Sequence, residues 1–157
     1  MRFEHLIEIN DPLNPLIDRL SREQLWRGLV LRAETPMDFV PHLDNCSILE
    51  RGELGLSREL RYGELVVRDR VSFHPMHKVT YHVPQQEGIP ESRLTMTIEE
   101  PEPDILFVRF VYDDGASEEQ DAAEAFYNDF RRSAYKESDI DTIRTIREMA
   151  EAGRLGE

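Results

Sequence analysis

The chain has 157 residues, and its 32 acidic side chains against 19 basic ones give a formal net charge of −13 at pH 7. A field of that sign repels polyanions and anionic membrane surfaces, and the cations are scattered among acids, so we expect no nucleic-acid binding. The apolar runs are far shorter than the roughly 20 residues that cross a bilayer, so we expect no membrane partner. The length is typical of one domain, and we expect residues 1–157 to form one.

Cysteine usage indicates the compartment. Cys46 is the single cysteine, so no intramolecular disulfide can form, and the stretch that begins Met1-Arg2-Phe3-Glu4 lacks the apolar core of a secretory signal. We therefore expect a cytoplasmic protein. Neither a helix start nor a clear Cys-His arrangement surrounds Cys46, which predicts a buried, inert thiol and not a nucleophile.

The first elements are predicted to be one strand and two helices. Apolar and polar side chains alternate over residues 3–9, which predicts a strand. A helix is predicted from about Ser21 to Glu34, because capping-box spacing at its start precedes an apolar helical stripe. Thr35, as an N-cap before Pro36, predicts a second, short helix.

The segment from Asn45 to Asp114 consists of about six short strands separated by glycine and proline. In residues 65–73 one face is apolar apart from Asp69, while the other face is almost entirely polar. Residues 79–83 and 94–98 repeat this alternation. One dry face and one wet face are typical of an antiparallel sheet packed on one side.

After Gly115, everything to about Leu155 has the pattern of helix. A straight helix of that length would measure about 60 Å, whereas a domain of this size is about 40 Å across. The apolar stripe before Ser138 is rotated relative to the stripe after it, and Ser138 and Asp141 have capping-box spacing. We therefore predict a kink or a re-capping of the helix near Ser138.

The order of strand, two helices, six strands and one long helix predicts an α+β fold and not a doubly wound one. Three segments also resemble a known superfamily: Phe3-Glu4-His5-Leu6-Ile7-Glu8-Ile9-Asn10, Leu25-Trp26-Arg27-Gly28-Leu29 and Ala134-Tyr135-Lys136-Glu137-Ser138-Asp139-Ile140-Asp141-Thr142-Ile143. On these residues the chain resembles the START-like (SRPBCC) helix-grip superfamily, which includes birch-pollen-allergen-like proteins and polyketide aromatase/cyclases. Within it the chain is most similar to the AtaL-like branch, over nearly its full length.

The resemblance implies a curved antiparallel sheet of about seven strands, wrapped around a long C-terminal helix, with two short N-terminal helices. It also implies an apolar cavity between sheet and helix, but no catalytic set, because members share the cavity and not one chemistry. The alternative is a filled core, since any packed domain has such apolar stripes. The residues expected to line the cavity are Tyr62, Val67, Tyr81, Met96, Phe110, Phe126 and Phe130.

Three ionisable side chains share the apparent inward face of the sheet with apolar neighbours: His5, Arg58 and Asp69. A buried carboxylate needs a partner, and Arg58 is the obvious candidate for Asp69. With Tyr81, these three are the candidates for an acid and a base acting on an enolisable ligand. The alternative interpretation is a structural ion pair at the rim of the sheet.

A metal site would need three or four converging ligands. His74, His77 and His82 have suggestive spacing, but period-2 alternation places His77 on the face opposite to the other two. We therefore expect no metal. Glycine-rich phosphate loops and nucleophile motifs are missing from the sequence, so we also expect no cofactor.

The sequence thus predicts a monomer or homodimer that binds a small hydrophobic molecule, aromatic or polyketide-like, in an interior cavity. A second hypothesis is an enzyme that cyclises, dehydrates or isomerises such a ligand in the same cavity. A third is a protein-interaction or dimerisation module that docks through the helix face around residues 140–149. Interacting polar side chains in the cavity would favour the enzyme, and a wholly apolar cavity would favour the carrier.

Overall fold

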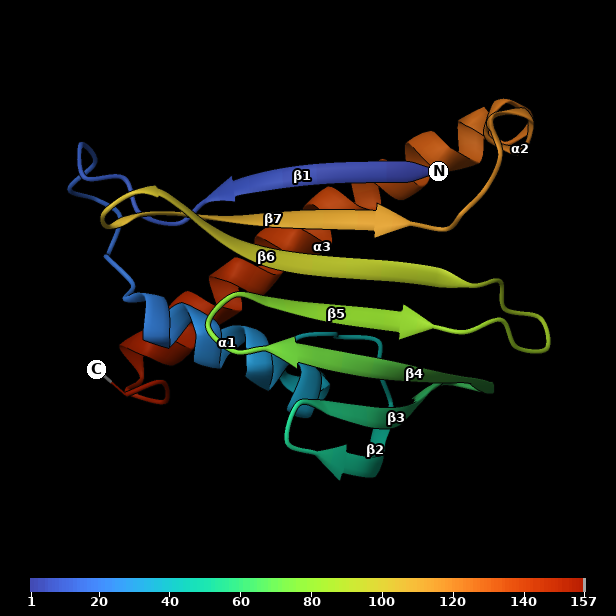
Figure 1. Cartoon of the computed structure of the whole chain (residues 1–157), viewed down its shortest axis with the longest axis horizontal. Helices are drawn as coiled ribbons and strands as arrows, with labels where there is room; N and C mark the ends of the chain where they lie inside the picture. Colours follow the sequence, from blue (N-terminus) through green and yellow to red (C-terminus); the bar gives the residue numbers. More distant parts are fainter. Residues whose placement is uncertain (157) are drawn as a thin grey trace.

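The computed structural model describes residues 1–156 and has the predicted α+β layout (Figure 1). Seven strands form one antiparallel sheet in the order β1-β7-β6-β5-β4-β3-β2. The strands are β1 (Arg2–Glu8), β2 (Asn45–Gly52), β3 (Gly55–Tyr62), β4 (Leu65–His74), β5 (Lys78–Val83), β6 (Ser92–Glu102) and β7 (Ile105–Asp113). The helices are α1 (Arg22–Glu34), the short 3-10 helix η1 (Pro36–Asp38), α2 (Glu118–Ala123) and α3 (Ala125–Glu151).

The strands β2 to β7 follow one another as neighbours in the sheet, and β1 completes the far edge by pairing with β7. The predicted six strands between Asn45 and Asp114 are therefore confirmed. Figure 1 shows α3 running obliquely across one face of the sheet, with α1 beside its C-terminal part. This arrangement leaves one face of the sheet covered by helices and the other open, as the alternation in β4 predicts.

Helix α1 begins as predicted. The Ser21 side chain accepts a hydrogen bond from the Gln24 amide, and the Gln24 side chain accepts one from the Ser21 amide. Where α1 meets α3, a Cβ atom on Gly28 would lie 2.6 Å from Ile146 Cγ2, so only glycine allows the two helices to approach this closely. The second helix is reduced to three residues of 3-10 helix, and the Thr35 hydroxyl donates back to the Leu31 carbonyl and does not cap η1.

The predicted kink near Ser138 is wrong. Helix α3 runs without a break from Ala125 to Glu151, about 40 Å, and the interruption falls at Glu124, between α2 and α3. The carbonyl of Ser138 accepts a bond from the Thr142 hydroxyl, 3.0 Å away, inside regular helix. The apolar stripe rotates because the helix changes its surroundings: almost all of its buried residues follow Ser138, where it packs on the sheet.

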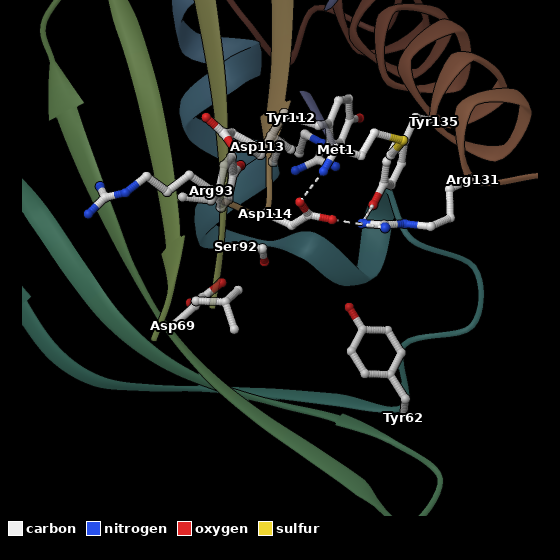
Figure 2. Close-up of a pocket in the computed structure, with 14 residues that line it drawn as sticks. Met1, Tyr62, Asp69, Ser92, Arg93, Tyr112, Asp113, Asp114, Arg131 and Tyr135 are labelled. Atoms are coloured by element: carbon white, nitrogen blue, oxygen red, sulfur yellow. Dashed lines mark hydrogen bonds and ion pairs between the residues drawn. The ribbon is translucent and has the colours of Figure 1, made fainter. Parts of the chain in front are cut away.

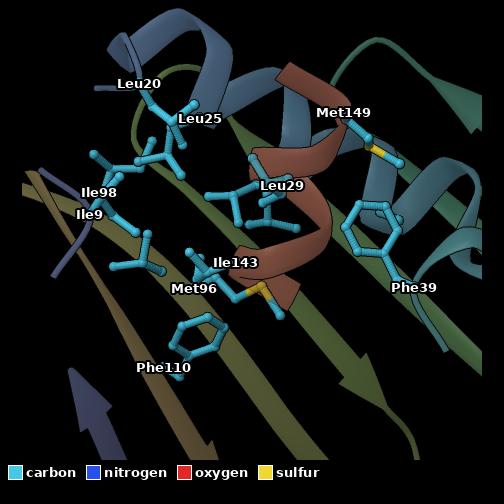
Figure 3. Close-up of a cluster of buried hydrophobic side chains, with 14 of the residues drawn as sticks. Ile9, Leu20, Leu25, Leu29, Phe39, Met96, Ile98, Phe110, Ile143 and Met149 are labelled. Carbon is cyan, nitrogen blue, oxygen red and sulfur yellow. The ribbon is translucent and has the colours of Figure 1, made fainter. Parts of the chain in front are cut away.

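The packed core lies between the covered face of the sheet and helices α1 and α3 (Figure 3). It brings together fully buried side chains from the residue that follows β1, from both helices and from the central strands, among them Ile9, Leu25, Leu29, Met96, Phe110 and Ile146. Within residues 1–156, no helix is long and apolar enough to span a bilayer. The core fills the space between the sheet and most of α1. The site described next lies beyond it, between the sheet, the C-terminal end of α1 and the first half of α3.

Candidate functional site

A cavity of about 330 Å³ opens between the covered face of the sheet, the end of α1 and the first half of α3. Four tyrosines line it: Tyr62 from β3, Tyr81 from β5, Tyr112 from β7 and Tyr135 from α3. Figure 2 shows Tyr62 facing the group of Asp114, Arg131 and Tyr135 across this space. Aromatic walls with hydroxyl tips, and not a wholly apolar surface, therefore define the site.

Asp69 lines the cavity and forms the predicted ion pair with Arg58. The two residues are direct cross-strand neighbours on β3 and β4, and both are buried. Arg58 Nε donates to Asp69 Oδ1 at 2.9 Å, Nη2 to Oδ2 at 2.6 Å, and Nη1 to the Ala33 carbonyl at 2.8 Å. This bidentate geometry satisfies both charges, as burial of an ion pair requires.

Two guanidinium groups flank Tyr81, a wall residue of the cavity. Arg58 Cζ and Arg32 Cζ each lie 5.2 Å from the centroid of the Tyr81 ring, within the range of cation–π attraction. Arg32, on α1, donates from Nε to Thr142 Oγ1 at 3.1 Å. The Tyr81 hydroxyl is buried and has no hydrogen-bond partner among residues 1–156.

A second polar cluster links Tyr112 to His5 through a buried carboxylate. The Tyr112 hydroxyl donates to Asp139 Oδ1, and Asp139 Oδ2 lies 3.2 Å from His5 Nδ1. Burial raises the pKa of Asp139 to about 6, although the bonds from Tyr112 and His5 act in the opposite direction. Burial and the nearby Asp139 charge raise the pKa of Tyr112. The ring of Tyr112 stacks on Tyr135, with 3.9 Å between centroids.

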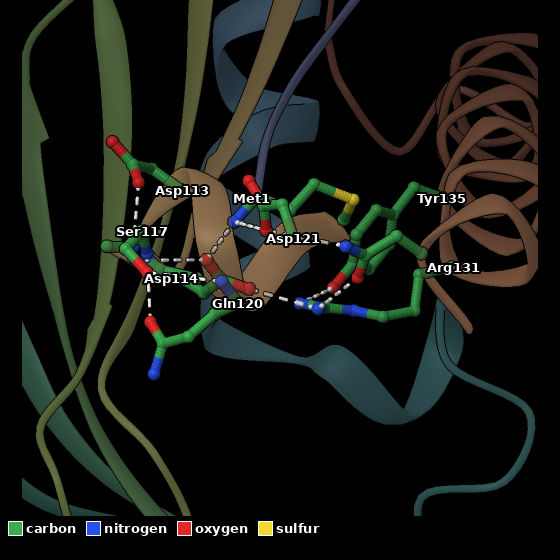
Figure 4. Close-up of polar contacts among 11 residues, drawn as sticks. Met1, Asp113, Asp114, Ser117, Gln120, Asp121, Arg131 and Tyr135 are labelled. Atoms are coloured by element: carbon green, nitrogen blue, oxygen red, sulfur yellow. Dashed lines mark hydrogen bonds and ion pairs between the residues drawn. The ribbon is translucent and has the colours of Figure 1, made fainter. Parts of the chain in front are cut away.

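Charged side chains hold the mouth of the cavity together (Figure 4). Arg131 Nη1 donates to Asp114 Oδ2 at 2.9 Å and Nη2 to the Tyr135 hydroxyl at 3.2 Å. The amino group of Met1 also pairs with Asp114. Burial alone would raise the pKa of Asp114, but the bonds from Met1, the Ala116 amide and Arg131 lower it to about 2. A groove of about 710 Å³ adjoins this mouth and shares Arg131 and Tyr135 with the cavity.

The structure places the predicted lining residues in three environments. Tyr62 and Tyr81 do line the cavity, although binding by them stays a prediction. Met96 and Phe110 are fully buried in the packed core, where the alternative of a filled core applies. Val67 is half-buried on β4 and lies outside the cavity wall.

The expectation that Phe126 and Phe130 face the cavity is wrong. Their side chains are 91% and 69% exposed, because this half of α3 presents them to solvent before the helix reaches the sheet. The docking face expected around residues 140–149 is also mostly covered, since Ile143, Ile146 and Met149 are buried and Ile140 alone of these is exposed.

The candidate catalytic residues divide between the two clusters. Asp69 and Tyr81 line the cavity and Arg58 contacts both of them, whereas His5 is linked to the cavity only through Asp139 and Tyr112. The three histidines considered for a metal do not converge: within residues 1–156 no group of three His, Cys, Asp or Glu side chains is placed to hold an ion. Burial raises the pKa of the half-buried Cys46 thiol, in line with an unreactive group.

Sequence reasoning missed several wall residues. Tyr112 follows Phe110 by two positions on β7 and therefore shares its face of the sheet. The alternation of side chains along the strand could thus have identified Tyr112 as an inward-facing residue. Arg32 lies three residues after Leu29 and seven after Leu25, on the buried stripe of α1. A charged residue on an apolar helical stripe is the signal that could have identified Arg32 as a wall residue. Tyr135 belongs to the segment that carries the family resemblance.

A curved antiparallel sheet gripping a long C-terminal helix, with a cavity between them, defines the START-like helix-grip class. The family described as AtaL, acetylaranotin biosynthesis cluster protein L, matches residues 7–153, and the chain belongs to this family. No protein in the curated set matches the sequence.

Solved structures of the same fold are only distantly similar in sequence. The Zhui aromatase/cyclase from Streptomyces sp. R1128 superposes with a TM-score of 0.63 at 14% identity, covering 98% of this chain and 94% of that one. Ara h 8.0201 gives a TM-score of 0.59 at 10% identity, over 97% and 98% of the two chains. Human STARD10 gives 0.67 at 11% identity, over 99% and 66%. These likenesses establish the fold.

Proposed function

We propose that this protein binds a small aromatic molecule with polar substituents in the tyrosine-lined cavity. The observation that carries the proposal is the cavity itself, about 330 Å³ and walled by Tyr62, Tyr81, Tyr112 and Tyr135. Its volume falls within the usual range for ligand sites. A cavity of about 150 Å³ holds benzene, so this one has room for a fused two-ring system. The adjoining groove offers space for a longer ligand to extend outward.

The composition of the wall supports an aromatic ligand over a purely aliphatic one. Ring faces favour offset stacking on a flat, conjugated guest, and the stacked pair of Tyr112 and Tyr135 already presents such a surface. Hydroxyl and guanidinium groups at the edges would orient the polar substituents of the guest. One of the distant structural neighbours is an aromatase/cyclase, which agrees with a guest of this chemistry.

A second candidate function is catalysis of a cyclisation, dehydration or isomerisation on the bound molecule. Polar side chains that contact one another border the cavity, notably Arg131 with Tyr135 and with Asp114. The Tyr112 hydroxyl, on the wall, bonds to Asp139, whose pKa of about 6 is suited to proton exchange near neutral pH. These contacts favour an enzyme by the criterion that distinguishes it from a simple carrier.

Titration with 2-naphthol, followed by NMR of the ¹⁵N-labelled protein, tests the binding proposal. We expect saturable shifts at the amides around Tyr62, Tyr81 and Tyr112. Leu94→Trp should abolish them, because Leu94 lines the cavity and the indole would fill it. The neighbouring Thr95→Trp points to the other face of β6 and should bind normally. Saturable shifts that survive Leu94→Trp would place the ligand elsewhere and contradict the proposal.

A further inference from the structure

The guanidinium of Arg32 is a cation on the cavity wall without an anionic partner. Nε donates to Thr142 Oγ1, and within residues 1–156 no carboxylate forms an ion pair with Arg32 and its two terminal amino groups make no hydrogen bond. A guanidinium has five N–H donors and stays charged at every accessible pH. Arg32 is half-buried, and charges drawn away from water in proteins are normally paired, so its unused donors require an explanation.

The neighbouring carboxylates are paired with other groups and form no ion pair with Arg32. Asp69 gives both of its oxygens to Arg58, at 2.9 and 2.6 Å. Asp139 gives one oxygen to the Tyr112 hydroxyl and the other to His5. Arg58 itself uses all three nitrogens, the third on the Ala33 carbonyl. Of the two guanidinium groups beside Tyr81, Arg32 is the one whose terminal amino groups make no hydrogen bond within residues 1–156.

The hydroxyl of Tyr81 is the second unsatisfied group at this place. Tyr81 is 5% exposed and lines the cavity, and its oxygen has no hydrogen-bond partner among the described residues. The Tyr81 ring lies 5.2 Å from Arg32 Cζ, so one ligand group could reach both. An unpaired buried hydroxyl normally costs stability, and a ligand oxygen would remove that cost.

We infer that the ligand carries a carboxylate, which Arg32 binds through its terminal amino groups with the Tyr81 hydroxyl as a further donor. This inference rests on the proposed function and adds the chemical class of the guest, an aromatic acid. A planar guanidinium matches a carboxylate in shape and can donate two parallel bonds. The net charge of −13 repels anions at long range, so a preference for an acid must come from these local donors.

The test compares 2-naphthoic acid with its neutral isostere 2-naphthamide by calorimetric titration at pH 7.5. The wild type should bind the acid at least about tenfold more tightly than the amide, as expected for hydrogen bonds to a charged group. Arg32→Met should remove this preference and leave the amide affinity within about twofold. Tyr81→Phe, which deletes one oxygen, should weaken the acid several-fold and the amide less.

Arg70→Met is the matched control, because it removes the same charge from the exposed face of β4, beside Asp69 but pointing away from the cavity. It should keep the preference for the acid. Equal binding of acid and amide by the wild type, or an acid preference that survives both Arg32→Met and Tyr81→Phe, would overturn the inference and leave the binding proposal standing. If the acid, the amide and 2-naphthol all fail to bind the wild type, both proposals fall.

Discussion

Replacing Asp139 by asparagine should make the unfolding free energy depend less on pH. The pKa of Asp139 is raised from an ordinary value of 3.8 to about 6, chiefly by burial. The folded state therefore holds this proton more tightly than the unfolded state, so the carboxyl favours folding less as the pH rises from about 3.8 to about 6. At about 1.36 kcal/mol for each tenfold change in proton affinity, the full loss is about 3 kcal/mol.

Asparagine has nearly the same shape, and its amide can accept from Tyr112 and donate to His5 without a charge. The free energy of unfolding of Asp139→Asn, relative to that of the wild type, should therefore rise by about 2 kcal/mol between pH 4 and pH 7.5. Urea unfolding at each pH measures it. Asp114→Asn is the contrast. The pKa of Asp114 is lowered to about 2, so its stabilisation is lost only as the pH falls from about 3.8 towards 2, and the difference from wild type should stay level from pH 4 to pH 7.5. A level difference for Asp139→Asn as well would refute the reasoning.

Three further predictions concern stability. Asp69→Ala leaves the Arg58 charge buried and unpaired, so it should lower the free energy of unfolding in urea by about 3 to 5 kcal/mol. The double variant Arg58→Met/Asp69→Leu removes both charges and should recover most of that loss. Equal losses in the single and the double variant would argue against a buried pair. Gly28→Ala should destabilise by about 1 kcal/mol or more through its clash with Ile146, and become stabilising in an Ile146→Ala background; the same sign in both backgrounds would contradict the close approach. Phe130→Ser, at a 69% exposed site, should change the free energy of unfolding by less than about 0.5 kcal/mol. A large loss of stability would mean that Phe130 is buried in solution.

The fold could be predicted from the sequence where local chemistry decides the structure. The capping box at Ser21 fixes the start of α1, and strict alternation fixes the inward face of β4, including Asp69, which pairs with Arg58 of β3. The break in the C-terminal helix could not be placed in the same way. In the structure a capping box forms at Ser117, at the start of α2, whereas Ser138 and Asp141 lie within continuous helix.

The site was predicted less well, because periodicity assigns a face but not what covers it. Tyr62 and Met96 both lie on the inward face, yet Tyr62 borders the cavity and Met96 is fully buried in the core. Phe126 and Phe130 follow helical spacing, but that half of α3 has no sheet to cover them. Which part of the space between sheet and helices is filled by core side chains, and which part is left as a cavity, depends on contacts between residues distant in sequence. The contact of Gly28 with Ile146 is one of them.

Native mass spectrometry of the protein purified from its own host tests the central claim most directly, since it reports a retained ligand by mass together with the oligomeric state. The account predicts one small aromatic acid for each chain, lost in Leu94→Trp, retained in Thr95→Trp and reduced in Arg32→Met. A retained molecule present equally in Leu94→Trp and in wild type would contradict the account, because that molecule would not occupy the tyrosine-lined cavity.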